Sequence, residues 1–181
     1  MTDATTGPPD TARLRLRRWQ PEDAEAALAT YGDERVARWL LPAMTQVSGV
    51  EAMGSLLEAW AAEAERLAPP AGRWAVTRRD DGVVVGGLAL LPLPPGGEDI
   101  EIAWAVAPEH QGHGYATEAA AALLRWGLEN GADEVFAVSR PSNQATEAVA
   151  SKLGMEWVGE TEKYYDLRLE VRRVRLADLA R

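Results

Sequence analysis

The segment from Gln111 to Thr117 has the residue types and spacing of an anion-binding turn. Gly112 and Gly114 stand one residue apart, and glycine permits positive φ and close approach of a ligand to the backbone. A helix is predicted to begin at Tyr115, and the first N–H groups of a helix lack intrahelical acceptors and carry partial positive charge. Such a turn suits a phosphate or pyrophosphate group. Two glycines alone also fit a simple strand-to-helix turn.

Two other phosphate-binding motifs match this turn less well. A Walker loop requires a lysine directly after its last glycine, and Gly114 is followed by Tyr115. A Rossmann fingerprint requires a third glycine, where this sequence has Thr117, and an acidic residue after the next strand, where Ser139 and Arg140 stand. The two histidines, His110 and His113, have no evident third ligand nearby, so we expect no metal site.

The elements around the turn predict an α/β fold with a mixed sheet. A strand at 100–106, a helix at about 115–130 and a strand at 135–138 follow one another, and a crossover helix makes the two strands parallel. Earlier, 74–77 and 83–91 are separated by a turn at Asp80-Asp81-Gly82, which is typical of an antiparallel hairpin.

Other segments extend this sheet and its helices. Arg13 to Arg17 alternates arginine and leucine, which predicts a strand whose arginines face solvent or form a basic edge near a bound anion. Further helices are expected at about 22–31, 33–41, 49–67 and 143–153, and further strands at 157–158 and 166–176. Residues 1–10 are polar with Gly7-Pro8-Pro9 and predict a disordered tail, followed by one domain over 11–181.

Composition excludes several classes of protein. The 181 residues carry 19 basic and 28 acidic side chains, a net charge of −9, which argues against binding nucleic acid or an anionic membrane. Cysteine is absent, which removes disulfides, thiolate metal sites and a cysteine nucleophile. No apolar run approaches membrane-spanning length, and the N-terminus has no signal-peptide pattern. A cytoplasmic location is therefore expected.

The motif residues resemble those of a known superfamily. Gln111-Gly112-His113-Gly114-Tyr115-Ala116 resembles the Gln/Arg-x-x-Gly-x-Gly/Ala acetyl-coenzyme A motif of the GNAT superfamily of N-acetyltransferases. The continuation Ala116-Thr117-Glu118-Ala119 and the segment from Asn143 to Met155 resemble the branch that acts on ribosomal-protein N-termini. The resemblance covers about Arg13 to Leu176.

This resemblance implies a GNAT-like fold in which the sheet is splayed between the strands at 100–106 and 135–138. Acetyl-coenzyme A would be the cosubstrate, with pantetheine between these strands. Val106 would offer backbone groups to pantetheine, and Asn143 matches a cofactor-contacting asparagine of the family. The turn residues carried over as cofactor contacts are Gln111, Gly112, His113, Gly114, Tyr115, Ala116 and Thr117.

Two residues are candidates for catalysis under the same resemblance. Glu101 stands where many family members place a glutamate that deprotonates the amine through water, although it also fits a solvent-facing strand position. Thr146 occupies the place of a serine proposed to protonate the thiolate in the ribosomal-protein branch, although it could equally cap its helix, and solvent is the alternative donor. Many superfamily members instead use a tyrosine at the position where this sequence has Ala150.

The implied function is transfer of an acetyl group from acetyl-coenzyme A to a primary amine by direct attack in a ternary complex. The acceptor would be a protein N-terminus or a small-molecule amine. The alternative is a non-catalytic acyl-coenzyme A-binding sensor or interaction domain, motivated by Ala150. Trp39 and Trp60 lie in the region that covers the acceptor groove in the family, where they serve the core or gate the substrate. A homodimer formed through the terminal strands is left open.

Overall fold

Seven strands form one mixed sheet in the computed structural model of the protein, which describes residues 7–178. The strand order across the sheet is β1-β2-β3-β4-β5-β7-β6. β4 and β5 are parallel, and the other neighbouring strands are antiparallel. The strands are β1 (Leu14–Arg17), β2 (Gly72–Arg78), β3 (Val84–Pro92), β4 (Ile100–Val106), β5 (Glu134–Ser139), β6 (Glu156–Thr161) and β7 (Leu169–Arg175). The predicted mixed α/β sheet, with its one parallel pair, is confirmed.

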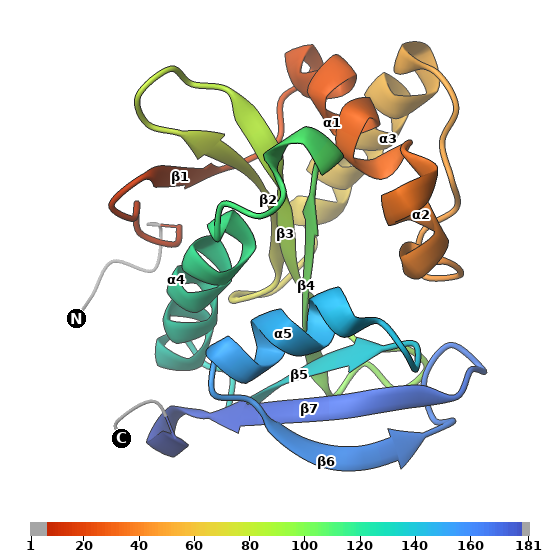
Figure 1. The fold of residues 1–181 in the computed structure, drawn as a ribbon, viewed down its shortest axis with the longest axis vertical. Helices are drawn as coiled ribbons and strands as arrows, with labels where there is room; N and C mark the ends of the chain where they lie inside the picture. Colours follow the sequence, from red (N-terminus) through yellow and green to blue (C-terminus); the bar gives the residue numbers. More distant parts are fainter. Residues whose placement is uncertain (1–6, 179–181) are drawn as a thin grey trace.

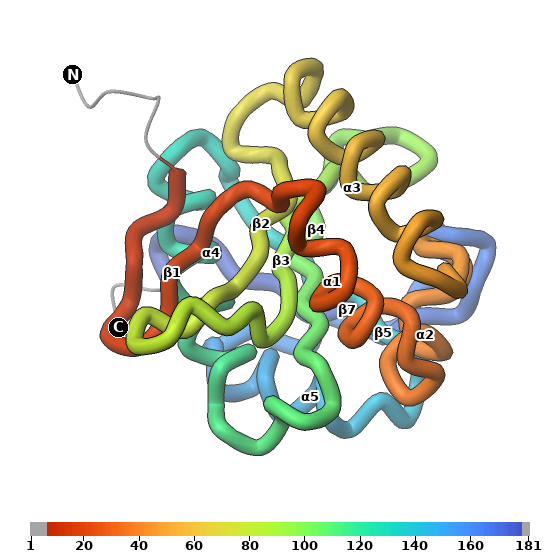
Figure 2. The backbone as a smooth tube through the Cα atoms, turned by 90° about the horizontal axis from the view of Figure 1, so that it is seen from above, coloured from red at the N-terminus to blue at the C-terminus, as the bar shows by residue number. Residues whose placement is uncertain are grey.

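Helices cover both faces of this sheet. Figure 2 shows β2, β3 and β4 between α4 on one side and α1 and α3 on the other. The helices are α1 (Ala24–Tyr31), α2 (Glu34–Leu40), α3 (Val50–Ala64), α4 (Tyr115–Glu129) and α5 (Gln144–Lys152), with short 3-10 turns at Pro21–Asp23, Pro108–His110 and Leu176–Asp178.

Several predicted boundaries differ from the structure by one to three residues, and two of them have an evident structural reason. The helix expected over 49–67 ends at Ala64, because the N–H groups of Arg66 and Leu67 both bond to the Glu63 carbonyl and tighten its last turn. The strand expected over 166–176 begins only at Leu169. Tyr165 and Asp166 have φ angles of 57° and 53°, which place them in the left-handed region and outside extended backbone.

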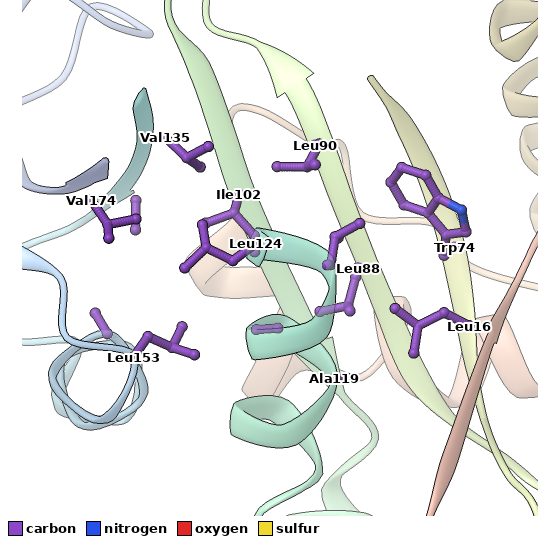
Figure 3. Packing of buried hydrophobic residues seen from close by; sticks show 14 of the residues in the cluster. Leu16, Trp74, Leu88, Leu90, Ile102, Ala119, Leu124, Val135, Leu153 and Val174 are labelled. Atoms are coloured by element: carbon purple, nitrogen blue, oxygen red, sulfur yellow. The ribbon is translucent and has the colours of Figure 1, made fainter. Parts of the chain in front are cut away.

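The larger hydrophobic core lies between the sheet and the helices α4 and α5. Leu88, Leu90 and Ile102 from the strands pack against Leu124 of α4, and Leu153 lies beside them just after α5 (Figure 3). A second core on the opposite face is formed by residues of α1 and α3, including Tyr31 and Met53, packed against the small side chains of Ala75 and Ala105. Successive side chains of β2 and β4 point to opposite faces of the sheet, so each strand contributes residues to both cores.

The parallel pair at the centre of the sheet is short. β4 and β5 are paired at one position only, Glu101 opposite Phe136. In Figure 1, β2, β3 and β4 run nearly vertically, whereas β5, β7 and β6 lie nearly across them, so the two groups of strands separate beyond this pair. The expected splay is therefore present.

The segment before β1 contacts the start of α4. The Thr11 hydroxyl and the Arg13 side chain both donate to the Glu118 carboxylate, at 2.6 Å each. Of the tail predicted over residues 1–10, residues 1–6 lie outside the described part, while Pro8 is buried and Asp10 pairs with Arg15 at 3.1 Å. Within residues 7–178, no helix is both long and apolar enough to cross a membrane.

Candidate active site

The turn between β4 and α4 presents a row of unpaired backbone donors. Gly112 and Gly114 both have φ of 79°, and Gly114 caps the N-terminus of α4, as their residue type predicts. Within residues 7–178, the backbone N–H groups from Gly112 to Thr117 have no acceptor. Since these donors are at the positive end of α4, the turn has the chemistry of a phosphate site.

Side chains hold this turn from two sides. The Gln111 side-chain amide donates to the Val106 carbonyl at 3.0 Å. Arg13 donates to the His113 carbonyl at 3.0 Å, and its guanidinium lies 4.9 Å from the centre of the Tyr115 ring. The His113 ring stacks on the other aromatic of the turn, Tyr115, with centroids 5.4 Å apart. The sequence left the arginines of 13–17 either facing solvent or forming a basic edge near an anion. Arg13, just before β1, contacts the turn and is placed for the second role.

The start of α5 is fixed by the predicted cofactor contact Asn143. Its side-chain oxygen accepts from the backbone N–H of Thr146 at 3.3 Å, which caps the helix. Asn143 is buried, and Thr146 is half-buried in the first turn. Ala150, one turn further, is fully buried in the core between sheet and helices.

Glu101 lies on the opposite face of the sheet from α4 and α5. Its neighbour Ile102 packs in the core with α4, so alternation directs Glu101 to the other face. The carboxylate is half-buried, and its oxygen Oε2 accepts a hydrogen bond of 3.0 Å from the hydroxyl of Tyr165. Burial raises the pKa of Glu101 to about 7, and the hydrogen bond from Tyr165 opposes part of this rise. A carboxyl with this pKa is well suited to exchange protons near neutrality.

Tyr165 belongs to the turn between β6 and β7, which is anchored to the start of β4. The Tyr164 hydroxyl donates to Asp99 at 2.6 Å, and the Lys163 ammonium donates to the same carboxylate at 2.5 Å. These two donors hold the pKa of Asp99 below its usual value. No pattern in the sequence indicates that Tyr164 and Tyr165 bond to Asp99 and Glu101.

An open depression of about 500 Å³ lies between β2 and the C-terminal end of α3. Arg73 of β2 pairs with Glu63 of α3, and its guanidinium lies 5.1 Å from the centre of the Trp60 ring of the same helix. Arg73 therefore contacts both Glu63 and Trp60. The depression is lined by Ala59, Trp60, Glu63, Arg66, Leu67 and Arg73.

The predicted site residues thus fall into two groups. The turn from Gln111 to Thr117 and Asn143 follow the carboxyl ends of the parallel strands β4 and β5, at one end of the splay. Glu101 marks the other end, at the one position where these strands pair. Within residues 7–178, no three histidine, aspartate or glutamate side chains gather as a metal site would require.

Comparison with known proteins identifies the family. The family described as "Acetyltransferase (GNAT) domain" matches residues 13–156. The chain therefore belongs to the GNAT acetyltransferase family, which confirms the resemblance carried by the motif at Gln111–Ala116. Two Bacillus subtilis proteins are similar: the uncharacterized N-acetyltransferase YoaA is 26% identical over 156 residues, covering 86% of each chain. YnaD, of the same description, is 27% identical over 154 residues, covering 84% of this chain and 85% of its own.

Solved structures share the fold. Mycobacterium smegmatis RimJ, in complex with CoA-disulfide, superposes with a TM-score of 0.76 at 22% identity, over 96% of this chain and 90% of its own. A ribosomal-protein-S5-alanine acetyltransferase from Vibrio fischeri superposes with a TM-score of 0.72 at 16% identity, over 96% and 98%. Ribosomal-protein acetyltransferases are thus among the structural neighbours, in line with the resemblance of the segment from Asn143 to Met155 to that branch.

Proposed function

We propose that this acetyltransferase moves an acetyl group from acetyl-coenzyme A to a primary amine by direct attack in a ternary complex. The observation that carries the proposal is the splay of β4 from β5, which has bare N–H groups at one end and the half-buried carboxyl of Glu101 at the other. The fold of a neighbour solved with a coenzyme A derivative supports the same reading.

The turn residues fit the phosphate part of the cosubstrate. The N–H groups from Gly112 to Thr117 would bind the pyrophosphate. From Val106 back to Glu101 is five residue steps along β4, or about 17 Å of extended strand. A linear pantetheine arm that follows β4 from the turn would therefore carry its thioester toward Glu101, with unpaired backbone groups of β4 beside it.

Glu101 supplies the base in this proposal. An alkyl ammonium has a pKa of about 10.4, so the amine must lose a proton before it attacks. Glu101 accepts that proton, directly or through water, because its own pKa near 7 leaves much of it ionised at neutral pH. The amine nitrogen then bonds to the acetyl carbon as the carbon–sulfur bond breaks, and coenzyme A leaves as a thiolate.

Protonation of the thiolate completes the reaction. A thiol of ordinary pKa, about 8.5, needs only a weak donor. Thr146 is our proposed donor, since its hydroxyl is in the first turn of α5 and its backbone N–H, not its side chain, takes part in the cap. The attacking nitrogen loses its second proton to solvent as the amide forms, solvent returns a proton to Thr146, and Glu101 releases the first proton to solvent, so that one proton is released in the overall transfer.

The acceptor class follows from the same chemistry. The site calls for a primary amine, such as a protein N-terminus or a small-molecule amine, and the names of the ribosomal-protein acetyltransferases support testing N-terminal peptides first. A cytoplasmic location and a homodimer stay predictions.

The decisive experiment is an initial-rate study over a panel of N-terminal peptides and small amines. Direct attack predicts intersecting double-reciprocal lines when both substrates are varied, whereas a covalent acyl-enzyme would give parallel lines. If coenzyme A binds by calorimetry but no amine in the panel is acetylated, the sensor alternative replaces the enzyme. That alternative has one structural point in its favour, since the fully buried Ala150 leaves no hydroxyl at the family's usual donor position.

A further inference from the structure

The turn between β6 and β7 is held in a conformation that its residue types do not favour. Tyr165 and Asp166 are consecutive non-glycine residues in the left-handed region, with φ angles of 57° and 53°. Such backbone costs free energy and persists only where surrounding contacts enforce it. Here Lys163 and Tyr164 both bond to Asp99, at the start of β4, and Tyr164 packs with Leu93 and Leu169.

The consequence of this conformation is that adjacent tyrosines reach two carboxylates on one strand edge. Tyr164 donates to Asp99, and Tyr165 donates to Glu101 two residues further along. Asp99 lies just before β4 and Glu101 is the second residue of that strand, so one anchored turn contacts both. Lys163 also bonds to Asp99, and the Tyr164 ring packs in an apolar cluster, so the turn stays anchored without the Tyr164 hydroxyl and keeps Tyr165 beside Glu101.

We propose that Tyr165 is a positioning residue that holds the carboxylate of Glu101 by its oxygen Oε2 and leaves Oε1 free to take the proton of the acceptor amine. The proposal rests on the acetyl transfer proposed above. Its geometric basis is the 3.0 Å hydrogen bond from the Tyr165 hydroxyl to Oε2. Within residues 7–178, Oε1 has no protein donor.

Charged groups near this pair are already engaged with one another. Arg73 of β2, which acts electrostatically on Tyr165, pairs with Glu63 of α3. Asp99, just before β4, pairs with Lys163 of the turn. The neutral hydroxyl of Tyr165 is therefore the group that stabilises the ionised form of Glu101, against a burial that disfavours it. Burial and the nearby carboxylate raise the pKa of Tyr165, so its hydroxyl stays protonated and remains the donor.

Tyr165→Phe tests the proposal because it removes the hydroxyl and keeps the ring. A hydrogen bond to the ionised form lowers a carboxyl pKa, so its loss raises the pKa of Glu101. The acid limb of kcat against pH should then move up by about one pH unit, which corresponds to about a fivefold fall in kcat at pH 7. The wild-type plateau should be regained at high pH, and a merely structural defect would not be relieved in this way.

Tyr164→Phe is the matched control. It removes a hydroxyl from the neighbouring residue of the same turn but leaves the bond to Glu101, so the midpoint of the acid limb should stay where it is in the wild type. Both variants and the wild type are assayed with one acceptor, so that the titration of the acceptor itself is common to all three. An unmoved midpoint in Tyr165→Phe, or an equal movement in both variants, overturns the proposal.

A second measurement on the unaltered protein does not depend on the folding of a variant. Carbon NMR of the Glu101 carboxyl and of the Tyr165 ring carbon that bears the hydroxyl should show both signals moving with one midpoint near pH 7. A Tyr165 signal that stays fixed while Glu101 titrates would refute the hydrogen bond. Failure of the proposed function looks different, because the wild type then acetylates no acceptor at any pH.

Discussion

The two ends of the splay between β4 and β5 offer different chemical groups: backbone N–H groups at one end and a side-chain carboxylate at the other. At the turn end, the donors are backbone N–H groups from Gly112 to Thr117, and they face outward at the start of α4. At the Glu101 end, the working group is one half-buried side chain, held by a tyrosine that lies 64 positions later in the sequence. The first is a local structure, and the second exists only after the sheet has formed.

This difference decides what each end tolerates. A backbone site depends on φ angles and therefore on its glycines, and the donors proposed here are not side chains. A side-chain site depends on protonation state, orientation and burial. Substitutions at the two ends should therefore separate cosubstrate affinity from turnover, and the following predictions are ordered from the largest effect to the smallest.

The sharpest separation is expected from Glu101→Gln. Removing a general base typically costs a factor of about 100 or more in kcat, while the N–H groups of the turn are untouched. We expect kcat to fall by about 100-fold and the Kd for coenzyme A, measured by calorimetry, to stay within about twofold of the wild type. A variant that keeps a third of its kcat would remove Glu101 from the mechanism.

The reverse pattern is expected from Gly114→Ala. An L side chain at φ of 79° is strained, by about 1–2 kcal/mol, and relief of that strain turns the adjacent N–H groups away from the ligand. The Kd for coenzyme A should rise by about tenfold, with a smaller change in kcat at saturation. Gly82→Ala is the control, because Gly82 has a φ of 75° in the β2–β3 turn with no atom near its added methyl group; equal weakening in both would point to a general loss of stability.

The smallest effect is expected at Thr146, in the first turn of α5, which we propose as the proton donor to the thiolate. Thr146→Val keeps the shape and the backbone N–H that bonds to Asn143, and it removes the hydroxyl. Because the leaving thiol needs only a weak donor, kcat should fall by about three- to tenfold, and Thr146→Ser should restore most of it. Equal activity in the valine and serine variants would assign the proton to solvent.

The sequence predicts the turn end well because its signals are short-range. Gly112, Gly114 and the helix that begins at Tyr115 are neighbours in the chain, and their conformations follow from residue type and helix-end chemistry. The strand order through β4 and β5 follows likewise from one crossover helix. The motif does not indicate that the Asn143 side-chain oxygen caps α5, and the contact of Asn143 with the cofactor stays a prediction.

The contacts that the sequence does not predict are long-range ones between side chains. Tyr165 meets Glu101 because two consecutive non-glycine residues adopt left-handed backbone, which residue preferences argue against. Arg13 supports the turn from 100 positions away, and alternation in its strand indicates only that it is not in the core. Such pairings depend on where the sheet places two distant segments, and a single sequence carries no signal for them.

The single pairing between β4 and β5 leaves two strand edges that face each other across the splay. An edge at the outside of a sheet exposes its peptide groups to other chains and invites aggregation. Edges that face each other inside one domain are out of reach of a foreign strand, yet their amides and carbonyls remain available to a slender molecule threaded between them. The protein can thus keep peptide groups unpaired for a ligand without the hazard that such groups bring at its outer surface.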